Sequence, residues 1–177
     1  MNETDFKHSL KKKIQQKLDG FYVKTDENLI YKVIINDELK YEPKNPESPI
    51  RGNYAFQTDI LICKDKVPLV VIETKYGGFS THDILTYSTK ALKHKEIYPY
   101  LRYGLVVGGD DVIHSRFFTH NVGFDFAITI KDINDENRLM ELIDIINKQI
   151  QNSNLLLDIQ NERYKIRKYN TLVVIEQ

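Results

Sequence analysis

The stretch AFQTDILICKDKVPLVVIETK, residues 55–75, decides the expected fold. Two apolar runs, residues 56–63 and 69–74, flank a polar turn at Asp65 and Lys66. Runs rich in Ile, Val and Leu with few polar interruptions are typical of strands that are buried on both faces. The stretch therefore predicts a hairpin of two strands inside a hydrophobic sheet.

Three charged residues interrupt this hairpin: Asp59, Glu73 and Lys75. Successive side chains of a strand alternate faces, so Glu73 and Lys75 should share one side, about 6.6 Å apart at roughly 3.3 Å per residue. Thirteen residues separate Asp59 from Glu73, and strand pairing would bring Asp59 across from both. Buried charges cost free energy unless a partner or a function compensates. The alternatives are solvated charges at the ends of a surface hairpin, and a buried Glu73–Lys75 ion pair without chemistry.

This pattern resembles the signature of the PD-(D/E)xK nuclease superfamily, with Thr58 where the name's proline would be. The segment TDILICKDKVPLVVIETK is similar to the N-terminal nuclease domain of type I restriction-enzyme motor subunits, and the likeness extends over about residues 3–109. The resemblance implies a restriction-endonuclease-like α/β fold, in which helices flank a mixed central β-sheet. It also implies a magnesium-dependent DNA endonuclease, as a single domain over residues 1–177.

The resemblance further implies roles for the residues of the signature. Asp59, Glu73 and the backbone carbonyl of Thr74 would bind Mg²⁺, which prefers oxygen ligands and which Mn²⁺ could replace. Lys75 would either position and deprotonate the attacking water or stabilise the pentavalent phosphorus. A nearby metal ion should lower the pKa of Lys75.

Many relatives carry a glutamine, three residues and a tyrosine in the helix after this signature. Tyr87 matches the tyrosine, whereas Asp83 stands at the glutamine position. Tyr87 is therefore a candidate contact to the active site or DNA, and a core tyrosine is the alternative.

In the resembling family a glutamate near the start of the first helix often reaches the metal. Glu3 precedes the pair Gly20-Phe21 in a similar arrangement, and Glu38 and Glu42 are competing candidates. The alternative for Glu3 is an acid in the first helical turn, which the helix dipole favours by about 0.3–1 kcal/mol.

The overall charge gives no attraction to nucleic acid, because 25 basic and 25 acidic residues cancel. Local patches would have to contact DNA, and the candidates are Lys90, Lys93, Arg51 and Arg102, with a solvated surface as the alternative for each. The single cysteine, Cys63, lies in an apolar run and indicates a packing role in a reducing cytoplasm. No membrane span or signal peptide is predicted, and the scattered histidines do not suggest zinc.

The remaining elements follow from periodicity and capping signals. We predict helices over residues 3–18, from Ser80 to about residue 95, and behind a cap at Asp135; strands within 21–35 and over 103–107, 112–118, 124–130 and 172–175; and a loop over 42–53. A helix over residues 27–35 is an alternative to strands there. The strand–helix–strand order after Glu73 predicts a right-handed crossover and a parallel strand pair.

The most consistent setting is restriction or another defence against foreign DNA. Double-strand cleavage would need two sites and hence a homodimer, and a motor or methyltransferase subunit is a further candidate partner. The alternatives are a repair or junction-resolving nuclease, and a non-catalytic DNA-binding module on a nuclease fold.

Overall fold

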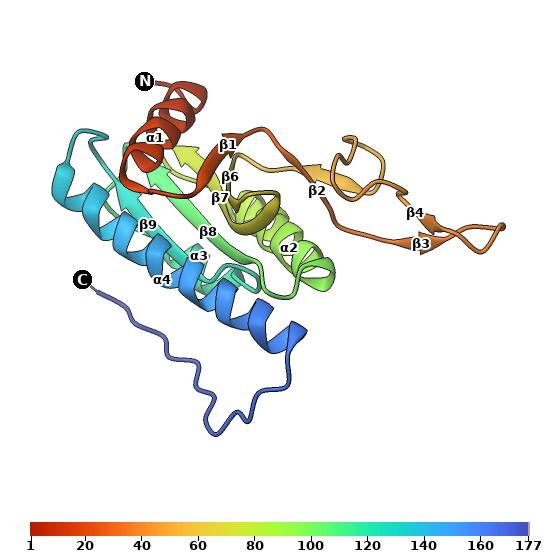
Figure 1. Ribbon diagram of the computed structural model, residues 1–177. Coiled ribbons are helices and arrows are strands. Elements are labelled where there is room, and N and C mark those ends of the chain that lie inside the picture. Colours follow the sequence, from red (N-terminus) through yellow and green to blue (C-terminus); the bar gives the residue numbers. More distant parts are fainter. Residues whose placement is uncertain (177) are drawn as a thin grey trace.

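The computed structural model describes residues 1–176, and its centre is a five-stranded sheet in the order β1-β6-β7-β8-β9 (Figure 1). The strands are β1 (Tyr22–Thr25), β6 (Ile60–Lys64), β7 (Val67–Tyr76), β8 (Arg102–Gly108) and β9 (Phe126–Ile130). The pairs β1–β6 and β6–β7 are antiparallel, whereas β7–β8 and β8–β9 are parallel. The predicted mixed sheet of an α/β protein is confirmed.

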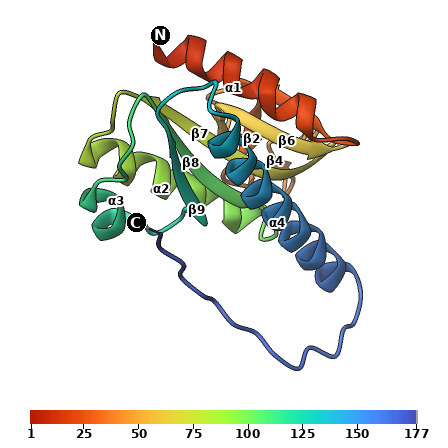
Figure 2. The same cartoon turned by 90° about the vertical axis from the view of Figure 1, so that its left-hand side faces the viewer.

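Helices cover both faces of this sheet (Figure 2). Helices α1 (Glu3–Lys17) and α4 (Glu136–Asn161) lie on one face, and α2 (Thr81–Ile97) and α3 (Ser115–His120) lie on the other. Each face has its own buried cluster, with Phe6, Leu10 and Ile143 in the first and Ile84 and Phe117 in the second. Both faces of the central strands are therefore removed from water, as the continuous apolar runs predicted.

The predicted hairpin is present as β6 and β7, with Ile60 opposite Ile72 and a turn at Asp65 and Lys66. Asp65 takes a positive φ of 53° in this turn, a conformation that Asp tolerates better than most residues. Cys63 is buried in β6, which agrees with its predicted packing role.

The predicted strand over residues 56–63 is wrong in one respect, because it is two strands, β5 (Ala55–Gln57) and β6. At the break, the N–H of Thr58 donates to the carbonyl of Glu27 at 2.8 Å, and its hydroxyl donates to the same oxygen at 3.0 Å. These bonds replace the main sheet's ladder at Thr58, so the chain leaves the sheet beside Asp59.

The strands that leave the sheet form a projecting two-stranded arm, residues 28–57 (Figure 1). In it β2 (Asn28–Ile30) pairs with β5, and β3 (Ile34–Ile35) pairs with β4 (Tyr41–Glu42). The predicted strands within residues 21–35 are confirmed, and most of residues 42–53 form the predicted loop.

The crossover from β7 to β8 passes through α2. Its first turn carries the predicted capping box, in which the Ser80 and Asp83 side chains each bond the other's backbone N–H. Such reciprocal capping satisfies two N–H groups that the helix cannot. Asp135 likewise caps α4 by accepting from the N–H groups of Asn137 and Arg138.

Two predicted strands are wrong. Residues 112–114 have no regular structure and residues 115–118 belong to the short helix α3, in which Phe117 is buried against the cluster beneath α2. Residues 172–175 lie in an extended segment without helix or strand, and their side chains are exposed. No helix within residues 1–176 combines the length and apolar character that a membrane crossing requires.

Candidate active site

The two carboxylates of the signature meet at one end of the β6–β7 hairpin. Oδ2 of Asp59 accepts hydrogen bonds from the N–H of Thr74 at 2.8 Å and from its hydroxyl at 3.1 Å. These bonds hold Asp59 beside the segment Glu73–Lys75, as strand pairing predicted. A carboxylate that accepts two donors has little freedom to rotate, so its other oxygen is presented in a defined direction.

Glu73 is a buried acid with two partners. Its side chain is 1% exposed, and Oε1 lies 2.7 Å from Nζ of Lys90 and 2.9 Å from the hydroxyl of Tyr103. Burial raises the pKa of Glu73, the charge of Asp59 adds to the rise, and Lys90 and Tyr103 oppose it. Because burial and Asp59 both disfavour the ionised form of Glu73, a second cation nearby would stabilise this carboxylate.

Lys75 lies on the same side of β7 as Glu73 and also faces α2, as strand alternation predicted. Its Nζ is 3.3 Å from Glu3 and 3.3 Å from Asp83. Burial disfavours the charge, but contacts with Tyr87, Glu3 and Asp83 outweigh burial and raise the pKa of Lys75. These contacts act against the lowering expected from a metal ion and favour a permanently charged ammonium.

Tyr87 lies between two lysines. Nζ of Lys75 is 5.2 Å from the centre of its ring and Nζ of Lys90 is 5.7 Å from it, which is within the range of cation–π attraction. The same side chain packs on the buried cluster beneath α2. Tyr87 thus combines the predicted site position with the core role that was its alternative.

Lys90 was predicted as a DNA contact, but the structure places it inside the site. Besides its ion pair with Glu73, Nζ donates to the backbone carbonyl of Gln57. The sequence carried a signal for this position, because Lys90 follows Tyr87 by three residues and therefore shares its helix face.

Two site residues, Tyr103 and His94, were missed. Nδ1 of the fully buried His94 lies 3.1 Å from the hydroxyl of Tyr103, and Nε2 lies 3.1 Å from the carbonyl of Leu29 in the arm. Burial and the charge of Lys90 lower the pKa of His94 to about 4, although the hydrogen bond with the Leu29 carbonyl acts to raise it. The imidazole of His94 therefore lies between the arm and the hydroxyl of Tyr103, which itself lies 2.9 Å from Oε1 of Glu73. Nothing in the local sequence separated Tyr103 from the apolar residues of β8.

Of the three candidate glutamates, only Glu3 reaches the site, through Lys75. Glu38 pairs with Lys40 at 2.7 Å, and Glu42 lies 3.6 Å from Lys44. Both belong to the β3–β4 end of the arm, which lies away from the central sheet (Figure 1). A contact from Glu3 to a metal ion stays a prediction.

The other three predicted DNA contacts differ in position. Arg51 is exposed and lines a cleft with Asp59 and Glu73. Lys93 points to Glu96, with both carboxylate oxygens 2.9 Å from Nζ. The site itself does not include Lys93.

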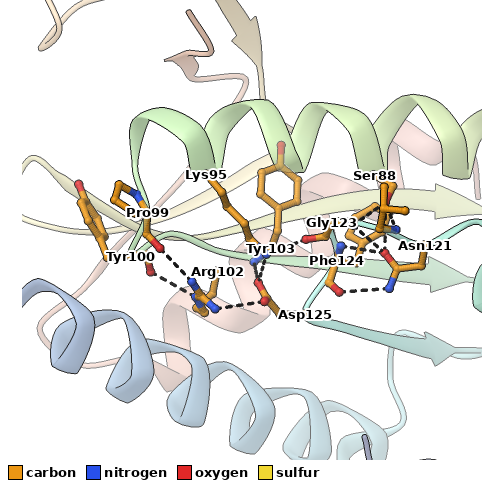
Figure 3. Close-up of polar contacts among 11 residues, drawn as sticks. Ser88, Lys95, Pro99, Tyr100, Arg102, Tyr103, Asn121, Gly123, Phe124 and Asp125 are labelled. Atoms are coloured by element: carbon orange, nitrogen blue, oxygen red, sulfur yellow. Dashed lines mark hydrogen bonds and ion pairs between the residues drawn. The ribbon is translucent and has the colours of Figure 1, made fainter. Parts of the chain in front are cut away.

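Arg102 lies at the opposite end of the parallel strands, where it pairs with Val70 rather than with Glu73. Its guanidinium donates to the carbonyls of Pro99 and Tyr100 and to Asp125, at 3.1–3.3 Å (Figure 3). These bonds tie the start of β8 to the loop before β9 and give Arg102 a structural role, whereas its contact with DNA stays a prediction.

The carboxylate oxygens of Asp59 and Glu73 are ligands of the kind that Mg²⁺ prefers. Within residues 1–176 no group of three or more His, Cys, Asp and Glu side chains is arranged to hold a metal. Mg²⁺ is, however, often held by one or two carboxylates together with waters and substrate phosphates. Asp59 and Glu73 supply two carboxylates that influence each other electrostatically, whereas the Thr74 carbonyl stays a predicted ligand.

Comparison of the chain with models of known protein families and with curated protein sequences gives no match. The functional assignment therefore depends on the geometry around Asp59, Glu73, Lys75 and Lys90.

Proposed function

We propose that this chain is a magnesium-dependent endonuclease that hydrolyses DNA phosphodiester bonds. The observation that supports it is the meeting of two carboxylates, Asp59 and Glu73, with two ammonium groups, Lys75 and Lys90, at one end of a buried strand pair. A fold gains little stability from charges in such a place. Phosphoryl chemistry needs both signs of charge there, because an anionic substrate must be held and its reaction stabilised.

Asp59 and Glu73 are the residues that would hold Mg²⁺. When bound, the ion would polarise the scissile phosphate and make a coordinated water more acidic. The chain's own contribution is orientation: the two donors of Thr74 fix Asp59, and the hydroxyl of Tyr103 fixes Glu73.

The lysines would act as fixed positive charges. Lys75 faces two carboxylates and so stays protonated, which favours charge stabilisation over proton abstraction among its two predicted roles. Lys90 neutralises Glu73 in the absence of other cations and would turn toward the phosphate once Glu73 has another partner. Preorganised charges of this kind typically accelerate a reaction by about 10²–10³ each.

The biological setting that we propose is restriction, or other defence against foreign DNA, in the cytoplasm. Support comes from the resemblance of residues 58–75 to restriction nucleases and from the buried free thiol of Cys63. A homodimer would supply the two sites that double-strand cleavage needs, and a motor or methyltransferase subunit is the candidate partner in a larger system.

The test is incubation of the protein with methylated plasmid, unmethylated plasmid and branched DNA, each in magnesium and in EDTA. Magnesium-dependent discrete fragments are expected. Cleavage of branched DNA alone would indicate a junction-resolving nuclease, and binding without cleavage would indicate a non-catalytic module. Cleavage that persists in EDTA would contradict the metal mechanism.

A further inference from the structure

The carboxylates of Asp59 and Glu73 line a cleft of about 430 Å³. One wall comes from the arm, with Tyr31 and Phe56, and the other comes from α2, with Thr86 and Tyr87. Arg51 lines the cleft as well. A volume of this size lies in the range of sites for small organic ligands. The aromatic part of the cleft, at Tyr31 and Phe56, offers no ligand for a metal ion and no charge for a phosphate.

The arm wall is a preformed aromatic surface. The rings of Tyr31 and Phe56 stack with their centres 3.8 Å apart and their planes 11° from parallel. Strand pairing fixes the backbone at both residues, because the N–H of Tyr31 donates to the Tyr54 carbonyl at 2.8 Å and Phe56 pairs with Leu29. Phe56 also meets the buried ring of His94 edge-on, with ring centres 5.9 Å apart. The pair is therefore positioned before any ligand arrives.

We infer that this cleft binds an unpaired nucleobase of the DNA whose phosphate lies at Asp59, Glu73 and Lys90. A nucleotide has a flat aromatic base beside an anionic phosphate, and the cleft offers an aromatic wall beside cationic and carboxylate groups in the same arrangement. Base–aromatic stacking needs only a free π face and so tolerates any base. Arg51 adds a donor fork for the base edge or a neighbouring phosphate.

The inference rests on the proposed nuclease function and restricts its substrate. Bases in a regular duplex are paired and stacked, so a base enters such a cleft only from single-stranded DNA or after rotation out of the helix. Single-stranded DNA can therefore enter the cleft directly, whereas a duplex is cleaved only after one nucleotide rotates out of the helix at the cleavage position.

The test measures binding apart from cleavage, with calcium in place of magnesium. Fluorescence anisotropy compares a short single strand, its duplex, and an abasic strand with the same number of phosphates. The wild-type protein should bind the single strand at least about fivefold more tightly than the other two. Equal affinity for the normal and abasic strands would overturn the inference, and this comparison needs no variant.

Variants then locate the stacking surface. Tyr31→Ala should lose the preference for the normal strand, whereas Tyr31→Phe, which keeps the ring, should retain it. Tyr41→Ala is the matched control, because Tyr41 is an exposed arm tyrosine, 70% exposed, that does not line the cleft. A Tyr31→Ala protein that still prefers the normal strand would place the base elsewhere and overturn the inference.

The two proposals fail separately. If the protein cleaves nothing in magnesium but shows the base-dependent affinity and its loss in Tyr31→Ala, the nuclease proposal fails and the cleft assignment stands. If the protein cleaves duplex DNA and binds the abasic strand as well as the normal one, the cleft assignment fails and the nuclease stands.

Discussion

The ammonium of Lys90 lies 2.7 Å from Oε1 of Glu73, and the two side chains are 12% and 1% exposed. An ion pair this deeply buried gains little over an apolar pair of the same shape, but losing one partner leaves an uncompensated charge. Lys90 thus holds a buried carboxylate that the fold alone does not need. The Glu73–Lys90 pair therefore affects both the stability of the protein and its proposed chemistry.

The first prediction follows from this pair. Lys90→Met keeps an unbranched side chain close to the length of the lysine stem but removes its charge, and should lower the free energy of unfolding by about 3–5 kcal/mol at pH 8. The loss should be smaller at pH 5, because Glu73, whose pKa is already raised, then becomes neutral without its partner. Urea unfolding at the two pH values measures both effects.

The matched control is Lys93→Met, three residues along the same helix. Among residues 1–176, Lys93 forms an ion pair only with the exposed Glu96, and a surface pair contributes about 0–1 kcal/mol. The double variant Glu73→Gln/Lys90→Met should regain part of the stability lost in Lys90→Met. If Lys90→Met and Lys93→Met lower the free energy of unfolding equally, Lys90 does not compensate the buried charge of Glu73.

The second prediction concerns cleavage. Asp59→Ala, Glu73→Ala and Lys75→Ala should each lower the cleavage rate by at least about 100-fold while the far-ultraviolet circular dichroism stays native, because their charges act on the reaction. Magnesium or manganese should support activity and calcium should support little. A variant of this set that cleaves DNA at the wild-type rate would remove its residue from the site, and Lys93→Met should retain full activity.

The hairpin and the meeting of Asp59 with Glu73 could be predicted because strand alternation and antiparallel pairing are local rules. The break at Thr58 could not, because it depends on hydrogen bonds to Glu27, more than thirty residues earlier. The sequence predicted that Tyr87 lies on the helix after Glu73. Whether Lys90 points into the site depends on which face of α2 is turned toward the sheet. Periodicity alone does not fix that orientation.

Tyr103 and His94 show a second limit of the sequence. Tyr103 resembles any large residue of an apolar strand, and only the parallel pairing of β7 with β8 brings its hydroxyl to Glu73. His94 looked like one of five scattered histidines, although it is fully buried. Contacts between distant strands and helices decide such roles, and no spacing in the chain encodes them.

The third prediction concerns Glu3, which contacts Lys75 at 3.3 Å. Glu3→Gln should slow cleavage by about tenfold, because Lys75 loses one of the two carboxylates that hold it in place. A tenfold change corresponds to about 1.4 kcal/mol. The magnesium concentration for half-maximal activity should stay the same, since the contact is to the lysine. A shift in that concentration would show instead that Glu3 acts on the metal, as the family resemblance suggested.

Asp5→Asn controls for the helix dipole, because Asp5 is an exposed acid in the same first turn of α1. Both variants should change the melting temperature slightly and alike. If both also slow cleavage equally, Glu3 is only a helix-start acid.

The fourth prediction concerns pH and His94, whose pKa falls from 6.5 to about 4 in the folded protein. Between these values the unfolded chain binds the proton that the folded protein excludes, so stability falls as the pH drops from 6.5 toward 4. Full protonation would remove up to about 3 kcal/mol. His94→Gln cannot titrate, so its unfolding free energy should depend less steeply on pH over this window than that of the wild type. His82→Gln, at an exposed position on the same helix, controls for the substitution. Parallel wild-type and His94→Gln curves between pH 4 and 6.5 would show that burial and the charge of Lys90 do not keep this imidazole neutral.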